Sequence, residues 1–540
     1  MKHKLLLAIM VVLLGLYQQS IAQSTTQKEE SQTAPSSERI FQKDIPYSAG
    51  EYKPLQFYAY FINQFVSTNM YPESSLYNGQ LVGRLFGANS SSTSATKTSF
   101  YAEQRLIPFF IYTPKLFNGK ALLRASFEID WTWGDQAYGI GGNKGGALSG
   151  DQVNIQTQNI EIELIPAKGW AVNMGLQRLY DTPFNPYRTF FEKMTYSSYR
   201  LAYWGSDAVG VSVRRNTDLS KMKFGYYKLY ENLQEIHDDV TLLEASFRRK
   251  LPNYWNVGVS MYAIIDRGKN TGGVSVYGQG LTSTLVTLNG GYKFDFGTND
   301  YTADIAWLGT YFSRNPDFIM DRVQLSGFFN YNLGKVNVVK EGWEQGVDVG
   351  GFGLNARAAY RYGQTVNDYV SFDYVYSTGD ENGISDGNYT GVITGNTWGL
   401  PASIFISSGS YLLFPHGNVV NRFTPAVADL SNMGYGLNAF TVNAHHDLIP
   451  HKLNVKIGGA QGFSNIIPQG GGANIGTEIN AAVKYQLGVF MSVELHAANL
   501  WLGDFYDSND ATYSSDINGS YNNRPPDPWT VFLVYKWLIF

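Results

Sequence analysis

The sequence lacks cysteine and is poor in charge. With no cysteine among 540 residues, disulfides, thiolate zinc sites and cysteine nucleophiles are excluded. Charged residues make up 16% of the chain, against about 25% in soluble globular domains. A soluble protein of this length would be expected to carry more surface charge. The formal net charge of −4 gives no indication of a nucleic-acid partner.

Long apolar runs are missing beyond the N-terminus. Leu5–Leu16 is an apolar run that follows Lys2 and Lys4 and precedes the small-x-small tripeptide Ser20-Ile21-Ala22. This run is too short to span a bilayer of about 30 Å. The pattern predicts a signal peptide over residues 1–22 and export of the chain. No later segment offers 18 consecutive apolar residues, so we expect no transmembrane helix.

Aromatic residues and glycine are abundant. The chain has 38 Tyr, 32 Phe, 11 Trp and 56 Gly, yet its mean hydropathy is slightly negative. Aromatic girdles, an apolar outer band and a polar interior produce this mixture in transmembrane β-barrels. The composition therefore favours a barrel over a soluble β-sandwich.

Apolar and polar residues alternate in segment after segment. In Leu123–Trp133 the odd-numbered residues are apolar, and the even-numbered residues include Arg124, Glu128 and Asp130. Successive side chains of a strand point to opposite faces, so this segment predicts a strand with one apolar and one charged face. The same pattern recurs in the segments 209–214, 243–248, 352–362, 478–487 and 489–496.

About 18 such segments fit between Leu55 and Phe540, and single-chain bacterial barrels have even strand numbers. We therefore predict an all-β fold, a transmembrane antiparallel β-barrel of about 18 strands in a single chain. The expected organisation is a signal peptide (1–22), a flexible periplasmic leader rich in Ser, Thr, Gln and Glu (23–50) and an outer-membrane barrel (51–540). The predicted location is the outer membrane of a Gram-negative-type bacterium.

Connections of two lengths separate the strands. The short ones, such as 167–169, 252–253 and 450–451, are predicted to be periplasmic turns. The longer ones are predicted to be extracellular loops, namely Gly134–Gly150, Arg267–Gln279, Gly379–Asn432 and Gly503–Pro528. We expect a monomer that contacts membrane lipids and lipopolysaccharide, and the terminal Phe540 fits a signal for the outer-membrane insertion machinery.

The functional surface of such a barrel is its inner face. Charges on the lipid face would cost about 2–4 kcal/mol each at midplane, so ionised residues are expected to point inward. The predicted solute path comprises Arg124, Arg178, Arg214, Arg248, Arg322, Arg357, Arg361, Lys456, Lys484, Glu128 and Asp130. The residues Glu244, Asp373, Glu478 and Glu494 share the inward parity. Two interpretations remain open, cross-strand ion pairs that stiffen the wall and an arginine row that favours anionic solutes.

The segment Gln177–Trp204 is dense in charge and is interrupted by Pro183 and Pro186. It is either an ordinary surface loop or an insert that constricts the barrel. The candidate constriction residues are Arg188, Glu192, Lys193 and Arg200.

Signals for catalysis and metal binding are weak. His445 and His446 are adjacent, so on a strand they point to opposite faces. No nucleophile elbow, phosphate loop or zinc-protease helix is present, and we predict that the chain is not an enzyme. No cofactor is expected, although Asp380, Asn382 and Asp386 are weak candidates for a structural calcium site whose spacing does not match an EF-hand.

Several short motifs resemble the alginate-export family of outer-membrane channels. They are Tyr374-Val375-Tyr376-Ser377-Thr378-Gly379-Asp380-Glu381, Phe414-Pro415-His416-Gly417 with Asn421, the block Asn438–Ala460, Gly476-Thr477-Glu478-Ile479-Asn480 and Gly175-Leu176-Gln177-Arg178. The resemblance implies an 18-stranded monomeric barrel with an arginine-lined conduit for anionic polysaccharide or smaller solutes. In the last motif the order of Arg and Gln differs from that of the family.

The predicted function is a porin-like channel for passive diffusion of hydrophilic solutes, with small anionic or saccharide solutes as the expected cargo. Three alternatives remain: an unselective porin, a plugged barrel with structural or adhesive loops, and a barrel enzyme.

Overall fold

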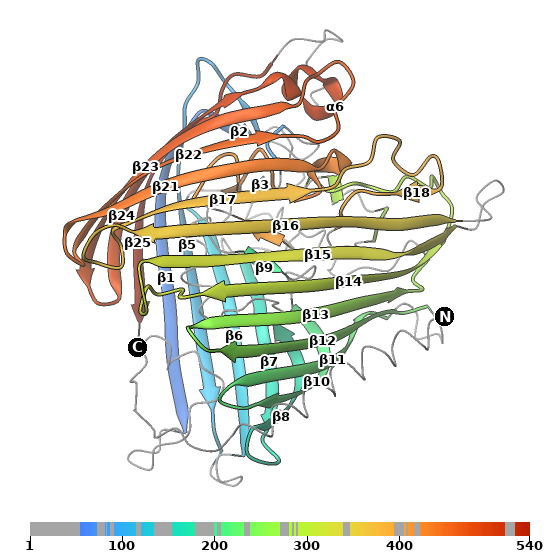
Figure 1. The fold of residues 1–540 in the computed structure, drawn as a ribbon, viewed down its shortest axis with the longest axis vertical. Coiled ribbons are helices and arrows are strands. Elements are labelled where there is room, and N and C mark those ends of the chain that lie inside the picture. Colours follow the sequence, from blue (N-terminus) through green and yellow to red (C-terminus); the bar gives the residue numbers. More distant parts are fainter. Residues whose placement is uncertain are drawn as a thin grey trace. The chain divides into compact units, whose positions relative to one another are not determined.

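Eighteen strands of the computed structural model form a closed antiparallel barrel. Each strand pairs with the next barrel strand along the chain, and β25 (Trp529–Ile539) pairs with β1 (Leu55–Thr68) to close the ring. These first and last strands, blue and red, lie side by side in Figure 1. Because a closed barrel has no free edge, the hydrogen-bonding groups of every barrel strand face a neighbouring strand. The predicted fold class and strand number are confirmed.

The remaining barrel strands follow in chain order. They are β5 (Ser99–Tyr112), β6 (Ala121–Thr132), β7 (Asn154–Leu164), β8 (Trp170–Arg178), β10 (Asp207–Asn216), β11 (Ser220–Tyr230), β12 (Val240–Leu251), β13 (Trp255–Asp266), β14 (Tyr301–Arg314), β15 (Val323–Val338), β16 (Val347–Arg361), β17 (Tyr369–Ser377), β21 (Leu437–Ile449), β22 (Leu453–Phe463), β23 (Asn474–Gly488) and β24 (Met491–Leu502).

Short strands in the connections form further pairs. Three of them are separate two-stranded sheets, namely β2 (Met70–Pro72) with β4 (Ser91–Thr93), β3 (Leu81–Val82) with β20 (Arg422–Phe423), and β9 (Tyr199–Leu201) with β19 (Ile404–Ile406). The fourth, β18 (Asn388–Tyr389), runs parallel to β16 at Asp348 and Val349. Two short helices, η3 (Asp504–Asp507) and α6 (Asn509–Thr512), follow β24, and η2 (Asn432–Gly434) precedes β21.

The structure describes residues 54–539 apart from 73–80, 83, 87–90, 115–119, 134–153, 179–198, 202–206, 232–237, 270–279, 283–285, 288–289, 339–345, 394–403, 407–408, 415–421 and 513–523. All described residues belong to the unit Tyr47–Phe540. The predicted signal peptide and leader lie outside the described residues. Among the described residues, no helix is long and apolar enough to cross a membrane.

The alternation seen in the sequence is the in-and-out pattern of the wall. In β6, Arg124, Ser126, Glu128, Asp130 and Thr132 are buried and face the interior. Leu123 lies on the outward face and is 42% exposed. Val209, Val211 and Val213 of β10 point outward in the same way, while Arg214 is buried. A period of two places every second side chain on the same face.

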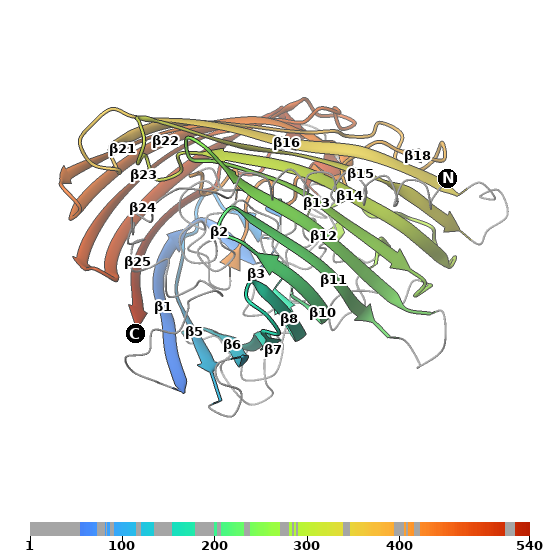
Figure 2. The same cartoon turned by 60° about the horizontal axis from the view of Figure 1, so that its bottom comes forward.

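An apolar cluster fills part of the barrel interior. It joins Ile62 of β1 with Tyr311 of β14, strands on opposite sides of the ring. The connection after β17 supplies Leu412, Leu413 and other apolar side chains between these walls. Strand β3 lies inside the ring of barrel strands in Figure 2. The interior is therefore crossed by folded chain as well as lined by the wall.

This interior packing corrects the prediction for two long connections. Gly379–Asn432 and Gly503–Pro528 were expected to be extracellular loops. Leu413 in the first and Phe505 in the second are at most 1% exposed and belong to the interior cluster. Both connections contain apolar residues that gain more from burial against the inner wall than from contact with water.

Candidate functional site

Ion pairs gather in clusters on the described part of the inner wall. The first lies between β5 and β6, where Arg105 donates two hydrogen bonds to the Asp130 carboxylate, at 2.8 and 2.6 Å. Arg105 also lies 2.7 Å from Glu128. All three side chains are at most 5% exposed. One arginine of β5 thus faces two carboxylates of the adjacent strand.

The second cluster joins β6, β7 and β10. Glu163 of β7 receives a bidentate pair of hydrogen bonds from Arg124 of β6, at 2.9 and 2.8 Å, and pairs with Arg214 of β10, which lies beyond β8. Asn173 of β8 donates a further hydrogen bond to Glu163, at 3.0 Å. The Glu163 side chain is completely buried. One carboxylate therefore forms ion pairs with two arginines.

The third cluster is centred on Glu494 of β24. Lys536 of β25 lies 2.9 Å from its carboxylate, His496 lies at 3.1 Å and Lys484 of β23 at 3.7 Å. Lys536, whose parity is ambiguous in the sequence, thus contacts an inward-facing carboxylate. Basic groups outnumber the single carboxylate here.

Most predicted path residues lie on the inner wall. Arg124, Arg214, Arg357 and Lys456 are buried there, as are Glu128 and Asp130. Arg248, Arg361 and Lys484 have the same inward parity and are partly buried. Arg357 is paired with Asp373 of β17, at 2.9 Å.

Arg361 differs from Arg357 although both belong to the same row of β16. Its Nε is buried without a hydrogen-bond partner, and no ion pair joins it to an acidic residue among those that the structure describes. Arg361 is four residues beyond Arg357, at the end of the strand that meets a short turn.

Arg322, another predicted path residue, lies in the exposed turn between β14 and β15, one residue before β15 begins. Its carbonyl accepts a hydrogen bond from the Arg361 N–H. In the same turn, Arg314 donates a hydrogen bond to Asp321 and lowers the pKa of this carboxyl to about 2. That Arg322 contributes to the solute path stays a prediction.

The candidate constriction lies largely outside the described residues. Arg188, Glu192 and Lys193 fall there, as does the side chain of Arg200, and the side chain of Arg178 is likewise not described. The backbone of Arg200 pairs with Phe405, in the connection after β17. Strand β9 also contacts β15, which lies six strands away from β8 around the ring. Whether the four residues constrict the barrel stays a prediction.

A buried carboxylate holds part of the connection between β17 and β21 to the wall. Glu478 of β23 is fully buried and accepts hydrogen bonds from the backbone N–H groups of Tyr411, Leu412 and Leu413, at 2.8, 2.9 and 2.7 Å. The Ser410 hydroxyl donates another. Lys456 of β22 also bonds the carbonyl of Gly409. Residues 409–413 are thereby fixed against β22 and β23.

The same connection also reaches the opposite wall. Trp307 of β14 donates a hydrogen bond to the Ile393 carbonyl at 2.7 Å, and the Asn332 side chain of β15 accepts one from the Ile393 N–H at 3.0 Å. The crossing segment, residues 378–436, therefore has anchor points on β14–β15 and on β22–β23. The anchoring role of Glu478 is not apparent from the sequence, although its inward parity is.

The weak calcium candidates have local roles. Asp380 accepts hydrogen bonds from the backbone N–H groups of Asn382 and Thr390, and Asp386 accepts one from Asn388. These are side-chain to backbone contacts within turns. The carboxylates that do gather among the described residues lie elsewhere, at Glu231, Asp238 and Asp239.

A closed antiparallel barrel with an apolar outer face and an ionised inner face defines the class of outer-membrane β-barrels. No family model and no curated protein matches the sequence. Several solved channel structures cover most of the chain at low identity. OccK5 (OpdH) of Pseudomonas aeruginosa is 9% identical, with a TM-score of 0.44 over 90% of this chain and 98% of that one.

Two further solved structures give similar values. The BenF-like porin from Pseudomonas fluorescens Pf-5 is 9% identical, with a TM-score of 0.45 over 90% of this chain and 98% of its own. The outer membrane channel DcaP of Acinetobacter baumannii is 9% identical, with a TM-score of 0.43 over 90% and 97%. These values assign neither a family nor a solute to this chain.

Proposed function

We propose that this barrel is a passive diffusion channel for small hydrophilic solutes and that it prefers anions. The observation that carries the proposal is the charge of the inner wall in the half nearer the short turns. Its basic members are Arg105, Arg124, Arg214, Lys221, Lys223, Arg248, Arg357, Arg361, Lys456, Lys484 and Lys536. Its acidic members are Glu128, Glu161, Glu163, Glu244, Asp373, Asp447 and Glu494. Lysine and arginine are the more numerous.

An excess of fixed cations favours anions in a confined aqueous path. Basic side chains replace part of the hydration shell of a passing anion, and they repel cations. The paired arginines stiffen the wall, so the preference is carried by groups such as Arg361. The ion-pair interpretation therefore applies to residues such as Arg357, and the anion-selective interpretation applies to residues such as Arg361.

The resemblance to the alginate-export family supports acidic saccharides as one kind of anionic cargo. Two motifs of this resemblance contribute residues to the crossing segment and its anchor. Phe414 is buried in the segment, and Glu478 binds the segment to β23. A narrowed path suits small solutes or an extended saccharide chain. We also propose that the protein is a monomer and that it has no enzymatic activity.

Reconstitution in planar bilayers tests the preference. Under a salt gradient, the reversal potential of the wild-type protein is expected to lie on the anion-selective side. Arg361→Gln should move it toward zero, because this change removes an inward charge that has no ion pair. Arg322→Gln makes the same substitution on an exposed turn and should leave the potential near the wild-type value.

Two outcomes would contradict the anion preference. A cation-selective wild-type channel would show that the acidic members dominate the path. Equal shifts in the two variants would show that Arg361 has no special position in it. A conductance without selectivity would identify an unselective porin.

A plugged barrel is the second candidate, favoured by the apolar cluster that joins Ile62 to Tyr311. In that case the interior is closed and the loops bind partners. Folded protein that inserts into bilayers without giving conductance steps would support this candidate over a channel.

A further inference from the structure

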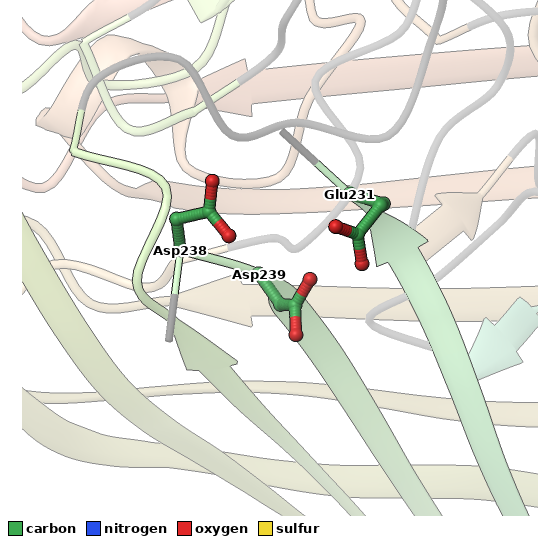
Figure 3. A group of neighbouring side chains, drawn as sticks. All are labelled: Glu231, Asp238 and Asp239. Atoms are coloured by element: carbon green, nitrogen blue, oxygen red, sulfur yellow. The ribbon is translucent and has the colours of Figure 1, made fainter. Parts of the chain in front are cut away.

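Three carboxylates gather at the loop between β11 and β12. Glu231 directly follows β11, and Asp238 and Asp239 directly precede β12. Each offers one oxygen, and these oxygens all lie within 4.8 Å of one another. Figure 3 shows Asp239 between the other two side chains. These three residues lie at the strand ends opposite the short turns that flank this hairpin, residues 217–219 and 252–254.

Asp238 is the unusual member of this acidic site. It is 7% exposed, and neither of its carboxylate oxygens has a hydrogen-bond partner. A buried carboxylate without a partner is costly unless a counter-ion or donor satisfies it. Its oxygen is nevertheless close to those of Glu231 and Asp239. This arrangement indicates a ligand for the three oxygens.

The charge of the acidic site matches a divalent cation. Lys228 forms an ion pair with Asp239 and lies 4.0 Å from Glu231. Three carboxylates and one lysine leave two negative charges.

The chemistry of the ligands narrows the choice of ion. All three offer carboxylate oxygens, which suit hard cations and not the softer metals that prefer thiolate or imidazole. Ca²⁺ accepts carboxylates in irregular geometry, whereas Mg²⁺ demands a near-ideal octahedron and keeps its waters. Glu231 and Asp239 are partly exposed, so water can supply the remaining ligands.

We propose that Glu231, Asp238 and Asp239 bind a Ca²⁺ ion. The ion bridges the end of β11 to the beginning of β12. The site requires no assumption about transport, because it lies on the rim of the barrel. Exchange-labile sites of this kind bind Ca²⁺ with dissociation constants of about 10⁻⁴–10⁻³ M.

Calorimetric titration of CaCl₂ into the full-length protein in detergent, after treatment with chelator, tests the site. The wild type is expected to bind one Ca²⁺, and MgCl₂ should bind more weakly. Asp238→Asn should weaken the binding of Ca²⁺ by about tenfold or more. Glu231→Gln should also weaken it, and this exposed position carries little risk for folding. Asp218→Asn, on the exposed turn at the other end of β11, is the matched control and should bind as the wild type does.

The outcomes separate the site from general effects on the barrel. No saturable Ca²⁺ binding by the wild type would overturn the proposal, as would wild-type affinity in both Asp238→Asn and Glu231→Gln. Tighter binding of Mg²⁺ than of Ca²⁺ would overturn the choice of ion. Circular dichroism and heat-dependent gel mobility identify any variant that does not fold, and Glu231→Gln then decides the result.

Discussion

Glu478→Gln is expected to raise the single-channel conductance severalfold. In the wild type, the Glu478 carboxylate accepts hydrogen bonds from three consecutive backbone N–H groups, those of residues 411–413. An amide has one oxygen and a donor NH₂ group, so part of this set of donors would lose its acceptor. Each buried group left unsatisfied costs about 1–3 kcal/mol. The crossing segment should therefore detach from β22 and β23 and widen the path.

The measurement is a comparison of conductance steps in planar bilayers under symmetric salt. Glu381→Gln serves as the control, because it makes the same substitution at an exposed position of the same segment. Release of the segment should also give proteolytic cleavage between residues 393 and 436 in the folded barrel. Wild-type conductance in Glu478→Gln, together with enhanced cleavage, would mean that the segment moves without narrowing the path. Wild-type behaviour in both assays would mean that the Trp307 and Asn332 contacts suffice to hold it.

The wall of the barrel was predictable because its signal is local. Alternation with a period of two assigns each residue of β6, such as Arg124 and Leu123, to one face without knowledge of the neighbouring strands. Strand number follows from the count of such segments. Strand β5 was harder, because Ile107 and Phe109 lie on the same inward row as Arg105 and are buried in the interior. Its pattern is less clearly two-faced, and Arg105 was missed.

The course of the long connections was not predictable from local pattern. Gly379–Asn432 is rich in Gly, Ser and Asn, a composition typical of exposed loops. Its apolar residues, Leu412 and Leu413 among them, show no strand period, and their burial depends on the inner wall, which places Ile62 and Tyr311 within reach. Glu478 is an ordinary inward carboxylate in the sequence. Its role depends on backbone groups more than 60 residues away in the chain.

Ion pairing is likewise a property of the register. Glu163 alternates clearly with Ile162 and Leu164, so its inward position could have been recognised. Its partners could not, because the pairing of Glu163 with Arg124 and Arg214 depends on how β6, β7 and β10 are aligned. Whether an inner arginine stiffens the wall or favours anions therefore depends on whether the register places an acidic partner beside it.

Glu163→Gln is expected to destabilise the barrel by about 3–5 kcal/mol, because it removes the carboxylate that both buried arginines contact and leaves Glu161, 3.6 Å from Arg124, beside them. Arg124 and Arg214 both pair with Glu163, and their side chains are at most 10% exposed. Asp348→Asn provides the control. Asp348 is 68% exposed and lies 3.7 Å from Lys335, and exposed pairs of this kind contribute about 0–1 kcal/mol. Denaturant unfolding in detergent, followed by tryptophan fluorescence, measures both variants.

The double variant Glu163→Gln/Arg214→Gln separates the loss of a charge partner from the loss of packing. It removes one of the two arginines along with the carboxylate, so it should recover part of the lost free energy of unfolding. If the double variant were as unstable as the sum of the two single variants, Glu163 and Arg214 would not be coupled. In bilayers, the folded fraction of Glu163→Gln should be more anion-selective than the wild type, because the inner wall loses one negative charge beside two arginines. The stability and the selectivity of the wall thus depend on the same carboxylate.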